Sequence, residues 1–429
     1  MGEVSPKHKE YVGVDIPPAA VVLQRVATQV VGCKREIDDG IYHPVLVSLG
    51  PYHHGHPRLK KLEHLKSEIL PLLLSDTQSS VLLRDIRNLS REIRAFYEDI
   101  NHLSDEALSK MMLLDACFLI YCIQKMAAHY DHDDVLNRLG MSRLAVIVRD
   151  FFMWENQLPF FLLKIIIPFT CEGIDDKSVD AFFCRLVSSM INCGDSCTQN
   201  LPQVPEGKQV RHLLDACRAA LVQEKETTEA ETVKAVNSQF RSVTDLKAKG
   251  IHFRPTKSKS YCLTDIEFRS HSFYGMLRLP ILLVDNKTNV ILSNIIAMEM
   301  SAGSGTDFAV TSYVKFMKAL IMKAEDVKEL REKGIVVSCV ANDEEVVKMF
   351  SALNTDGSCR KDVFRGVRER INEHCRSKTK TFKAELLHTY FRSPWTAIAL
   401  FAAILILCVN CLNFLLNYYK FTLSTLKPA

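Results

Sequence analysis

The densest group of histidines in this sequence lies in one short stretch. Histidine is the side chain best suited to proton transfer and metal binding near neutral pH. His43, His53, His54 and His56 lie in this stretch (residues 43–56, the histidine loop), and His64 follows it. Imidazoles at this spacing could bind zinc or copper. No cysteine or carboxylate lies at a recognisable ligand spacing, and the glycines and prolines indicate turns. The pattern therefore favours a structural loop over a metal site.

A second group of chemically capable side chains interrupts the apolar run WENQLPFF, residues 154–161. Glu155 could serve as a catalytic carboxylate. The favoured interpretation is structural: Glu155, Asn156 and Gln157 cap and hydrogen-bond the backbone of an adjoining segment, as buried polar side chains usually do. A membrane-tethered enzyme of unrecognised type, built on Glu155 and the histidine loop, is the alternative. It would require a deep pocket that joins them.

The remaining motifs carry little chemical information. Cys193 and Cys197 form a lone CGDSC, which is half of a zinc site without a second pair. Cys408 and Cys411 lie in an apolar run, where they act as small hydrophobic side chains, with lipidation as a minor alternative. Residues 301–308 contain two glycines but match neither nucleotide-binding fingerprint, and they indicate a flexible loop between helices. We therefore assign no catalytic, cofactor-binding or metal-ligating residue, and identify no small-molecule substrate.

Composition is that of an ordinary globular protein, with 47% hydrophobic and 24% charged residues, so the chain should fold around a real core. The net charge of +4 is small for 429 residues and gives no argument for a nucleic-acid partner. The 14 cysteines are scattered rather than set at the spacing of a disulfide scaffold. This usage indicates a reduced, cytosolic body.

The clearest element is an uncharged run near the C-terminus, Trp395 to Leu416, which Arg392 and Lys420 enclose. At about 1.5 Å per residue, a helix of this length crosses a hydrocarbon core. Trp395 and the tyrosines at 418–419 lie where an aromatic belt would place them. We predict a single transmembrane helix over residues 394–418, which binds the lipid bilayer. A buried helix of a soluble domain is the other explanation, but such helices rarely stay uncharged for so long.

Flanking charge predicts the direction of this helix. Five basic residues precede it and two follow: Arg376, Lys378, Lys380, Lys383 and Arg392, then Lys420 and Lys427. The positive-inside bias keeps the body in the cytosol and sends the short tail, residues 419–429, across the membrane. The N-terminus has no apolar core for a signal, so insertion would resemble that of tail-anchored proteins. The plasma membrane is one candidate membrane, and the basic segment 365–383 would contact anionic lipid. A luminal body, suggested by the sequons at Asn88 and Asn286, is a further alternative.

The body, residues 16–391 after a polar tail at 1–15, is predicted to be mainly α-helical with a small β-rich insertion, an α+β arrangement. Apolar periodicity predicts helices at 16–32, 80–100 and 104–126. Met111–Ile123 and Phe151–Phe169 are very apolar, but the first is short and the second contains charges, so both indicate core helices rather than further membrane spans.

The β-rich part is predicted near 251–292, after a polar linker near 223–236. Short β-type runs separated by turn residues predict its strands. They are Ile251–Arg254, Leu263–Phe268, Met276–Leu279, Ile281–Val284 and Val290–Leu292. Four helices follow, at 313–322, 324–333, 344–353 and 362–374. The pentapeptide LLDAC occurs at 113–117 and again at 213–217, in flanks so different that we interpret the recurrence as a coincidence of helix cores.

Taken together, several of these motifs resemble a plant-specific family, the domain of unknown function 247 (UPF0481-like membrane proteins). The motifs include VSLGPYHHG, LLDACFLI, RDFFMWENQLPFFLL, RHLLDACR, LRLPILLVDNKT and YFRSPWTAIALFAAILIL. They occur in the family's order from about Ile16 to Leu416. The resemblance implies a membrane-anchored plant protein without an established catalytic residue set. Some grass members are implicated in self-incompatibility, a recognition role, which implies an interaction or signalling component with unidentified protein partners.

Overall fold

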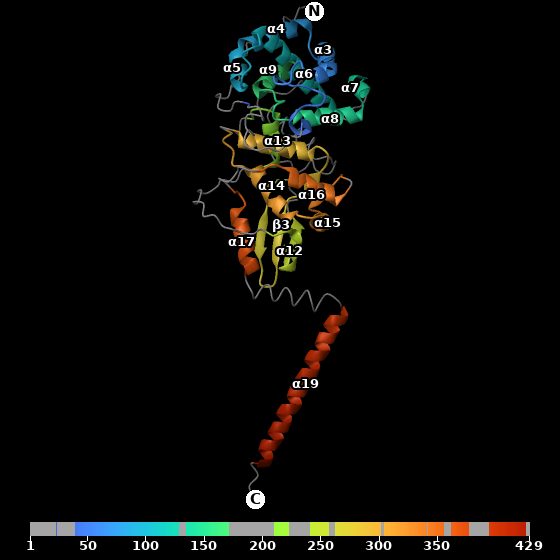
Figure 1. Ribbon diagram of the computed structural model, residues 1–429, viewed down its shortest axis with the longest axis vertical. Coiled ribbons are helices and arrows are strands. Elements are labelled where there is room, and N and C mark those ends of the chain that lie inside the picture. Colours follow the sequence, from blue (N-terminus) through green and yellow to red (C-terminus); the bar gives the residue numbers. More distant parts are fainter. Residues whose placement is uncertain are drawn as a thin grey trace, which may run out of the picture.

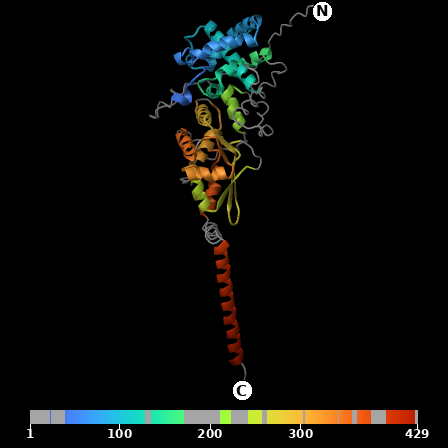
Figure 2. The ribbon, with the colours of Figure 1, turned by 90° about the vertical axis from the view of Figure 1, so that its right-hand side faces the viewer.

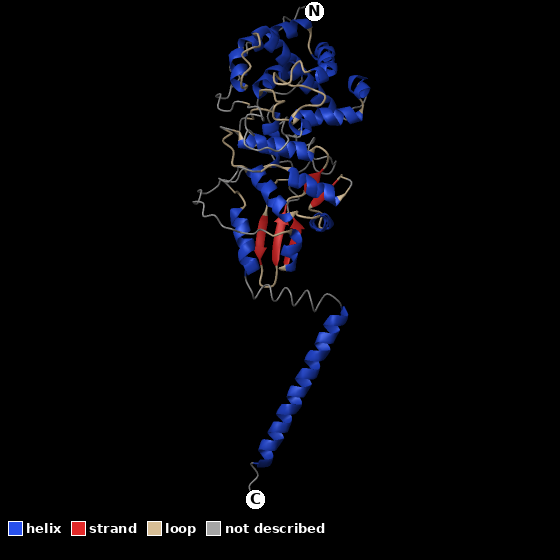
Figure 3. Cartoon of the chain, in the orientation of Figure 1, coloured by secondary structure: helices blue, strands red, loops and turns tan. Residues whose placement is uncertain are grey.

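The computed structural model describes residue 23 and residues 39–127, 134–170, 210–222, 241–256, 262–301, 304–340, 342–355, 362–376 and 394–425. Helices dominate the body and the strands are short, as Figure 3 shows. The predicted mainly α, α+β fold class is confirmed. The linker near 223–236 and the CGDSC pair lie outside the described residues.

The N-terminal part of the body is a group of helices around α6, and Figure 1 shows it at the end of the body farthest from α19. The helices are α2 (Asp39–Tyr42), η1 (Pro57–Leu59), α3 (Lys60–Leu73), α4 (Asp76–Asn88), α5 (Ser90–Phe96), α6 (Asp105–Ala127), α7 (Asp134–Leu139), α8 (Met141–Phe151) and α9 (Phe160–Thr170). Helices α3, α4, α5 and α9 all contact α6. Its apolar centre, Met111–Ile123, is buried, which confirms the prediction of a core helix.

Two predicted helices differ from the structure in this part. The helix predicted at 80–100 begins earlier, at Asp76, because Ser75 and Gln78 form a capping box there. It breaks at Leu89 into α4 and α5. The stretch predicted as a helix at Phe151–Phe169 is buried as expected, but residues 152–159 are irregular and α9 begins at Phe160. Proline at 159 favours a helix start at this point.

The helix predicted at 16–32 is wrong at the one position that the structure describes. Leu23 forms a parallel β-bridge with Tyr97, its N–H donates to the carbonyl of Phe96 at 2.8 Å, and its side chain is 1% exposed. A pattern of apolar residues cannot distinguish a buried extended segment from a buried helix when the partner strand is distant in sequence.

The C-terminal part contains two small sheets. The first has the order β1 (Ile251–Pro255), β3 (Gly275–Leu279), β2 (Glu267–Ser270), with β1 parallel and β2 antiparallel to β3. The second pairs β4 (Leu282–Val284) with β5 (Val336–Ser338) in parallel. One face of the first sheet is buried, and its other face carries the exposed side chains of β1 at His252 and Arg254. Figure 2 shows the strands along one side of the lower body.

Helices surround these sheets: α11 (Leu213–Leu221), α12 (Val243–Ala248), α13 (Thr288–Met300), α14 (Ala309–Leu320), α15 (Ala324–Glu332), α16 (Asp343–Ala352) and α17 (Arg365–Arg376). The strand predicted at Val290–Leu292 is wrong, because these residues belong to α13. Almost every side chain of α13 is buried, so its β-branched residues pack on all sides of a helix and burial overrides their strand preference. Strand β5 was not predicted.

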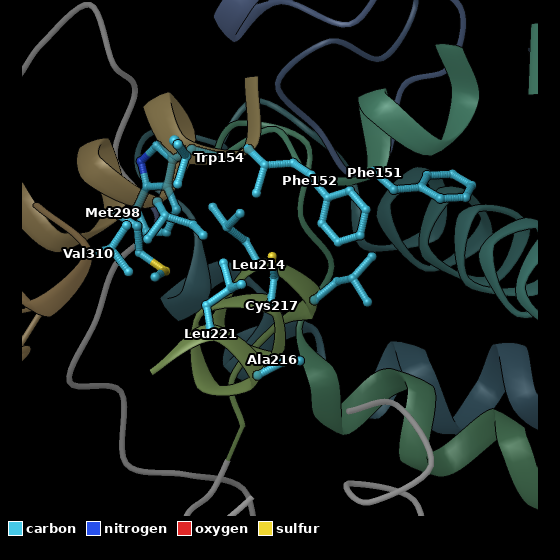
Figure 4. Packing of buried hydrophobic residues seen from close by; sticks show 14 of the residues in the cluster. Phe151, Phe152, Trp154, Leu214, Ala216, Cys217, Leu221, Met298 and Val310 are labelled. Carbon is cyan, nitrogen blue, oxygen red and sulfur yellow. The ribbon is translucent and has the colours of Figure 1, made fainter. Parts of the chain in front are cut away.

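A buried ionic group joins three helices of the C-terminal part, α11, α13 and α14. Arg218 on α11 donates from Nε to Glu299 on α13 at 2.7 Å and also contacts Asp307. The Glu299 carboxylate further accepts the backbone N–H groups of Val310 and Thr311 at 3.2 and 2.8 Å. Both Arg218 and Glu299 are nearly inaccessible. Buried apolar side chains from α11, α13, α14 and the turn after α8 pack together, including Trp154, Leu214, Met298 and Val310 (Figure 4). The charge of Glu299 is therefore fully compensated inside the core.

The last helix, α19 (Pro394–Thr425), stands apart from the body in Figure 1. It contains an 18-residue apolar stretch, Phe401–Tyr418, that is long enough to cross a membrane, and none of this stretch is buried. A core helix of a soluble protein with such a composition would be mostly buried. The predicted apolar C-terminal helix is therefore present, and by length and composition it could cross a membrane.

Removing the Glu299 carboxylate should take away the buried acceptor of Arg218 and of two backbone N–H groups. We expect Glu299→Ala to lower the free energy of unfolding by about 3–5 kcal/mol, measured by urea unfolding of the full chain in detergent. Glu373→Ala on α17, whose side chain is exposed, is the control and should stay within about 0.5 kcal/mol of the wild type. Equal effects of the two substitutions would contradict a structural role for this group.

Candidate functional site

The densest polar group of the N-terminal part surrounds a buried stretch of backbone, residues 45–50. Val47, Ser48, Leu49 and Gly50 are almost completely inaccessible, yet they belong to no helix or strand. Buried backbone N–H and C=O groups need hydrogen-bond partners. Side chains from α3, α6, α8 and the turn after α8 supply them.

Asp150, at the end of α8, satisfies the first part of this stretch. One carboxylate oxygen, Oδ2, accepts the backbone N–H groups of Val45, Leu46 and Val47 at 3.0, 2.7 and 3.1 Å. Asn156 satisfies the next part, because its Oδ1 accepts the N–H of Leu49 at 2.6 Å and its Nδ2 donates to the carbonyl of Val47 at 3.1 Å. The two side chains together fix the path of the loop.

Lys66 and Asp115 satisfy the end of the stretch. Asp115 on α6 accepts the N–H of Gly50 at 2.7 Å through Oδ2 and the ammonium of Lys66 at 2.6 Å through Oδ1. Lys66, 0% exposed, also donates to the carbonyl of Ser48 and to Glu63, each at 2.6 Å. All three ammonium protons thus have acceptors. Gly50 has a φ of +73°, and a Cβ there would lie 2.8 Å from the hydroxyl oxygen of Tyr97, so glycine is required.

Burial dominates the electrostatics of both carboxylates. It raises the pKa of Asp115 above its ordinary value, although the charge of Lys66 and the Gly50 amide lower it. It also raises the pKa of Asp150, against the lowering effect of the three backbone amides. The hydrogen bonds are what keep these acids compatible with an apolar interior.

Gln157 holds a second junction. Its Oε1 accepts the N–H of Leu214 at 2.9 Å, and its Nε2 donates to the carbonyls of Phe151 and Met153 at 2.8 and 2.6 Å. Its own carbonyl accepts the hydroxyl of Tyr97 at 2.8 Å. The structural interpretation of the WENQ segment, that its polar side chains bond to neighbouring backbone, is thus confirmed for Asn156 and Gln157.

The histidine loop contains this stretch, and His53, His54 and His56 lie after it. His53 is the member that contacts the WENQ segment: its Nε2 lies 3.3 Å from Glu155, and their side chains are 11% and 6% exposed. Its ring also meets that of His43 edge-on, with centroids 5.4 Å apart. His54 lies 3.7 Å from Glu63. His56 accepts the N–H of Arg58 at the start of η1, and His64 contacts Glu68 at 3.1 Å, both on the surface.

These contacts form no recognisable catalytic or metal centre. Among the described residues, no group of three or more histidine, cysteine or acidic side chains could hold a metal ion. Two hollows on the described part of the surface, of about 290 and 560 Å³, lie in the C-terminal part, beside α16 and beside β1. His53 and Glu155, the residues of the alternative enzyme interpretation, are in contact, but neither hollow joins them.

His212 is a buried titratable residue to which the sequence gave no role. It is the N-cap of α11: its Nδ1 accepts the N–H of Asp215 at 3.2 Å, and the rings of Trp154 and Phe96 pack edge-on against it. Burial lowers the pKa of His212 to about 3. Nδ1 must therefore stay unprotonated to accept this bond. Its place directly before the LLDAC pentapeptide was the only signal, because histidine is uncommon as an N-cap.

The chemistry available to this group is limited by its own hydrogen bonds. The three protons of Lys66 and both oxygens of Asp115 have partners within the protein, so neither can bind a substrate without releasing the loop. The arrangement is suited to holding residues 45–50 in one conformation and displaying the histidine loop at the surface.

Comparison with known proteins agrees with the motif order. The family DUF247, described as "Plant protein of unknown function", matches residues 27–409. The UPF0481 protein At3g47200 of Arabidopsis thaliana is 24% identical over 87% of this chain and 82% of its own length. The putative UPF0481 protein At3g02645 of the same plant is 25% identical over 87% and 86%. No solved structure matches the chain.

The buried ion pair allows a direct test of the role of Lys66. We expect Lys66→Met and Asp115→Asn each to lower the free energy of unfolding by about 3–5 kcal/mol, because each leaves a buried partner uncompensated. The double variant should lose clearly less than the sum, since the second change removes the charge that the first one stranded. Urea unfolding measures all three. Lys61→Met, at an exposed position of α3, is the control; additivity of the two single effects would refute the coupling.

His212 should make the folded protein sensitive to acid. The folded state resists protonation down to a pKa of about 3, while the ordinary value is 6.5. The unfolded state therefore binds the proton first, and stability present above pH 6.5 should fall as pH decreases, by about 1.4 kcal/mol per unit. His212→Asn keeps a capping side chain but does not titrate.

The measurement is urea unfolding of the wild type and His212→Asn between pH 7.5 and 4.5. The difference between the two proteins should change steadily in favour of the variant below pH 6.5. Asp115 and Asp150, whose pKa values are raised, act with the opposite sign, but they are common to both proteins. A pH-independent difference would show that His212 is not the responsible group.

Proposed function

Because the chain belongs to the plant family DUF247, for which no activity is established, we propose from its own structure that it is a membrane-anchored recognition protein that acts through protein partners. The observation that carries the proposal is α19, whose 18-residue apolar stretch is fully exposed. A helix of this kind gains stability only when lipid or another apolar surface covers it. The tether would then hold the folded body at a bilayer.

The body supports recognition over catalysis. Its buried acidic and basic groups, such as Lys66, Asp115 and Glu299, are bonded to backbone or to each other rather than aimed into a cavity. A rigid interior of this kind fixes the loops and helices of the surface. In this proposal the body lies in the cytosol, as the flanking charges favour, and the plasma membrane is the candidate site. Self-incompatibility, the role that the resemblance implies for some members, is one setting for such recognition.

A membrane-tethered enzyme is the second candidate, and the contact between His53 and Glu155 is the observation that favours it. An imidazole 3.3 Å from a nearly buried carboxylate is a pair that could transfer protons. Such a pair also needs a cavity for its substrate. The hollows described above lie elsewhere, and the recognition proposal is therefore preferred.

The anchor can be tested by deletion. We expect removal of residues 394–429 to move the body from the membrane fraction to the soluble fraction, because no other described helix passes the length and composition test for a span. Centrifugation of carbonate-washed membranes measures this. In the control, an unrelated apolar span of equal length replaces α19, and this protein should remain in the membrane. Tight membrane attachment of the deleted protein would contradict the proposal.

Proximity labelling in the native tissue, with the full chain, the deleted protein and the span-replacement control, tests for protein partners. The full chain and the span-replacement control should label a common set of membrane-associated proteins, and the deleted protein should lose them, because recognition depends on the body held at the membrane. A set that follows α19 rather than the body would show that the helix itself selects the neighbours.

A further inference from the structure

The hairpin between β2 and β3 exposes aromatic side chains at its tip. The N–H of His271 donates to the carbonyl of Tyr274 at 2.8 Å and closes a tight turn around Ser272 and Phe273. The side chain of Phe273 is 54% exposed and that of Tyr274 is 38% exposed. Large aromatic residues are unusual at a solvated turn, where small polar residues are preferred. Their exposure indicates a contact surface.

A basic hollow lies beside this tip. It has a volume of about 560 Å³, and its lining includes His252, Arg254, Tyr274, Glu332 and Lys333. Two of these residues come from β1, where His252 pairs with Met276 and Arg254 pairs with Arg278 across the strands. The ring of Tyr274 lies 5.6 Å from that of His252, so the aromatic tip and the hollow form one continuous surface, which we call the hairpin surface.

Positive charge prevails on the hairpin surface. Glu332 is its acidic member, and nearby Glu329 is engaged by Lys247 and lies 3.9 Å from Lys333. Arg254 is exposed at the middle of β1. Partial burial and the positive charges of Lys333 and Arg254 lower the pKa of His252. This shift agrees with an excess of positive charge at the hairpin surface. A phosphate group entering the hollow would be attracted by these cations.

The chain leaves the body next to the hairpin surface. His374, near the end of α17, lies 2.8 Å from the hydroxyl of Ser270 at the end of β2, and its ring packs on Phe268. Helix α17 ends two residues later, and 17 residues (377–393) connect it to α19. Their full reach is about 60 Å, at roughly 3.5 Å per residue. Figure 1 shows the sheet and α17 at the end of the body that faces α19.

Resting on the membrane tether proposed above, we propose that the hairpin surface binds the membrane itself: Arg254 and Lys333 contact the phosphates of anionic phospholipid headgroups, while Phe273 and Tyr274 enter the interfacial layer. Aromatic rings prefer this layer, and basic side chains are attracted to an anionic leaflet. The tether keeps the local lipid concentration high, so even a weak contact would be occupied. The contact would orient the body and leave its opposite end, with the histidine loop, facing the cytosol.

The test uses the full chain in nanodiscs of phosphatidylcholine, with or without phosphatidylserine, and measures amide hydrogen exchange. Residues 271–276 should exchange about tenfold more slowly in the anionic discs, and added salt should abolish the difference. Arg254→Glu should lose the protection, as should Phe273→Ser. Arg84→Glu, on exposed α4 at the opposite end of the body, is the matched control and should keep it.

The same experiment distinguishes the headgroup contact of the hairpin surface from the membrane anchoring by α19. Amides of α19 should be protected in both kinds of disc if the helix spans the bilayer, and those of α14 report whether each variant is folded. Equal exchange of residues 271–276 in both discs, with α19 protected, would overturn the headgroup contact alone. Equal protection by free inorganic phosphate in neutral discs would also overturn it, because the hollow would then bind a soluble anion.

Discussion

The structure depends on how residues 45–50, a buried backbone without a neighbouring strand, find hydrogen-bond partners. Asp150, Asn156, Asp115 and Lys66 supply them from three helices and a turn. Each of these side chains would be costly to bury alone, and each loop amide would be costly to leave unpaired. Both costs are avoided when these side chains and the loop amides bond to each other. The loop therefore fixes α3, α6 and α8 relative to one another, and they in turn fix the loop.

The same solution appears within the C-terminal part of the body. Glu299 on α13 pairs with Arg218 on α11 and accepts the N–H groups of Val310 and Thr311 in the first turn of α14. A helix leaves such groups unpaired at its N-terminus. A single buried carboxylate thus orders three helices. The side-chain amide of Gln157 acts in a similar way: it accepts the N–H of Leu214 and so links the turn after α8 to α11. Polar groups are placed in this core to specify the geometry, and the apolar contacts around them supply most of the stabilisation.

The sequence predicts the elements whose signal is local. Helices α6, α15 and α16, strands β1 and β3, and the apolar run of α19 follow from periodicity, caps and length. It fails where a distant partner decides. Leu23 is extended because its N–H donates to the carbonyl of Phe96 and its carbonyl accepts the N–H of Glu98. Val290–Leu292 is helical because its surroundings are apolar on every side. Residue type identified the WENQ side chains as backbone partners, but not the loop about 100 residues earlier that they hold.

The two LLDAC pentapeptides show why motif chemistry alone does not define a site in this protein. Both pentapeptides lie in helices that pack in the core, as the sequence interpretation expected, and the aspartate of each is buried. Asp115 faces Lys66 and a loop amide, and burial raises its pKa. Asp215 is also subject to desolvation by burial, but Arg211 and His212 outweigh it and lower its pKa. Identical sequence thus gives opposite acidities, because charge and hydrogen bonds from other segments decide them. In both cases the carboxylate accepts hydrogen bonds from other residues of the protein. A function that left these groups in place would have to use the surface, where the body presents loops and the hairpin that the buried network keeps rigid.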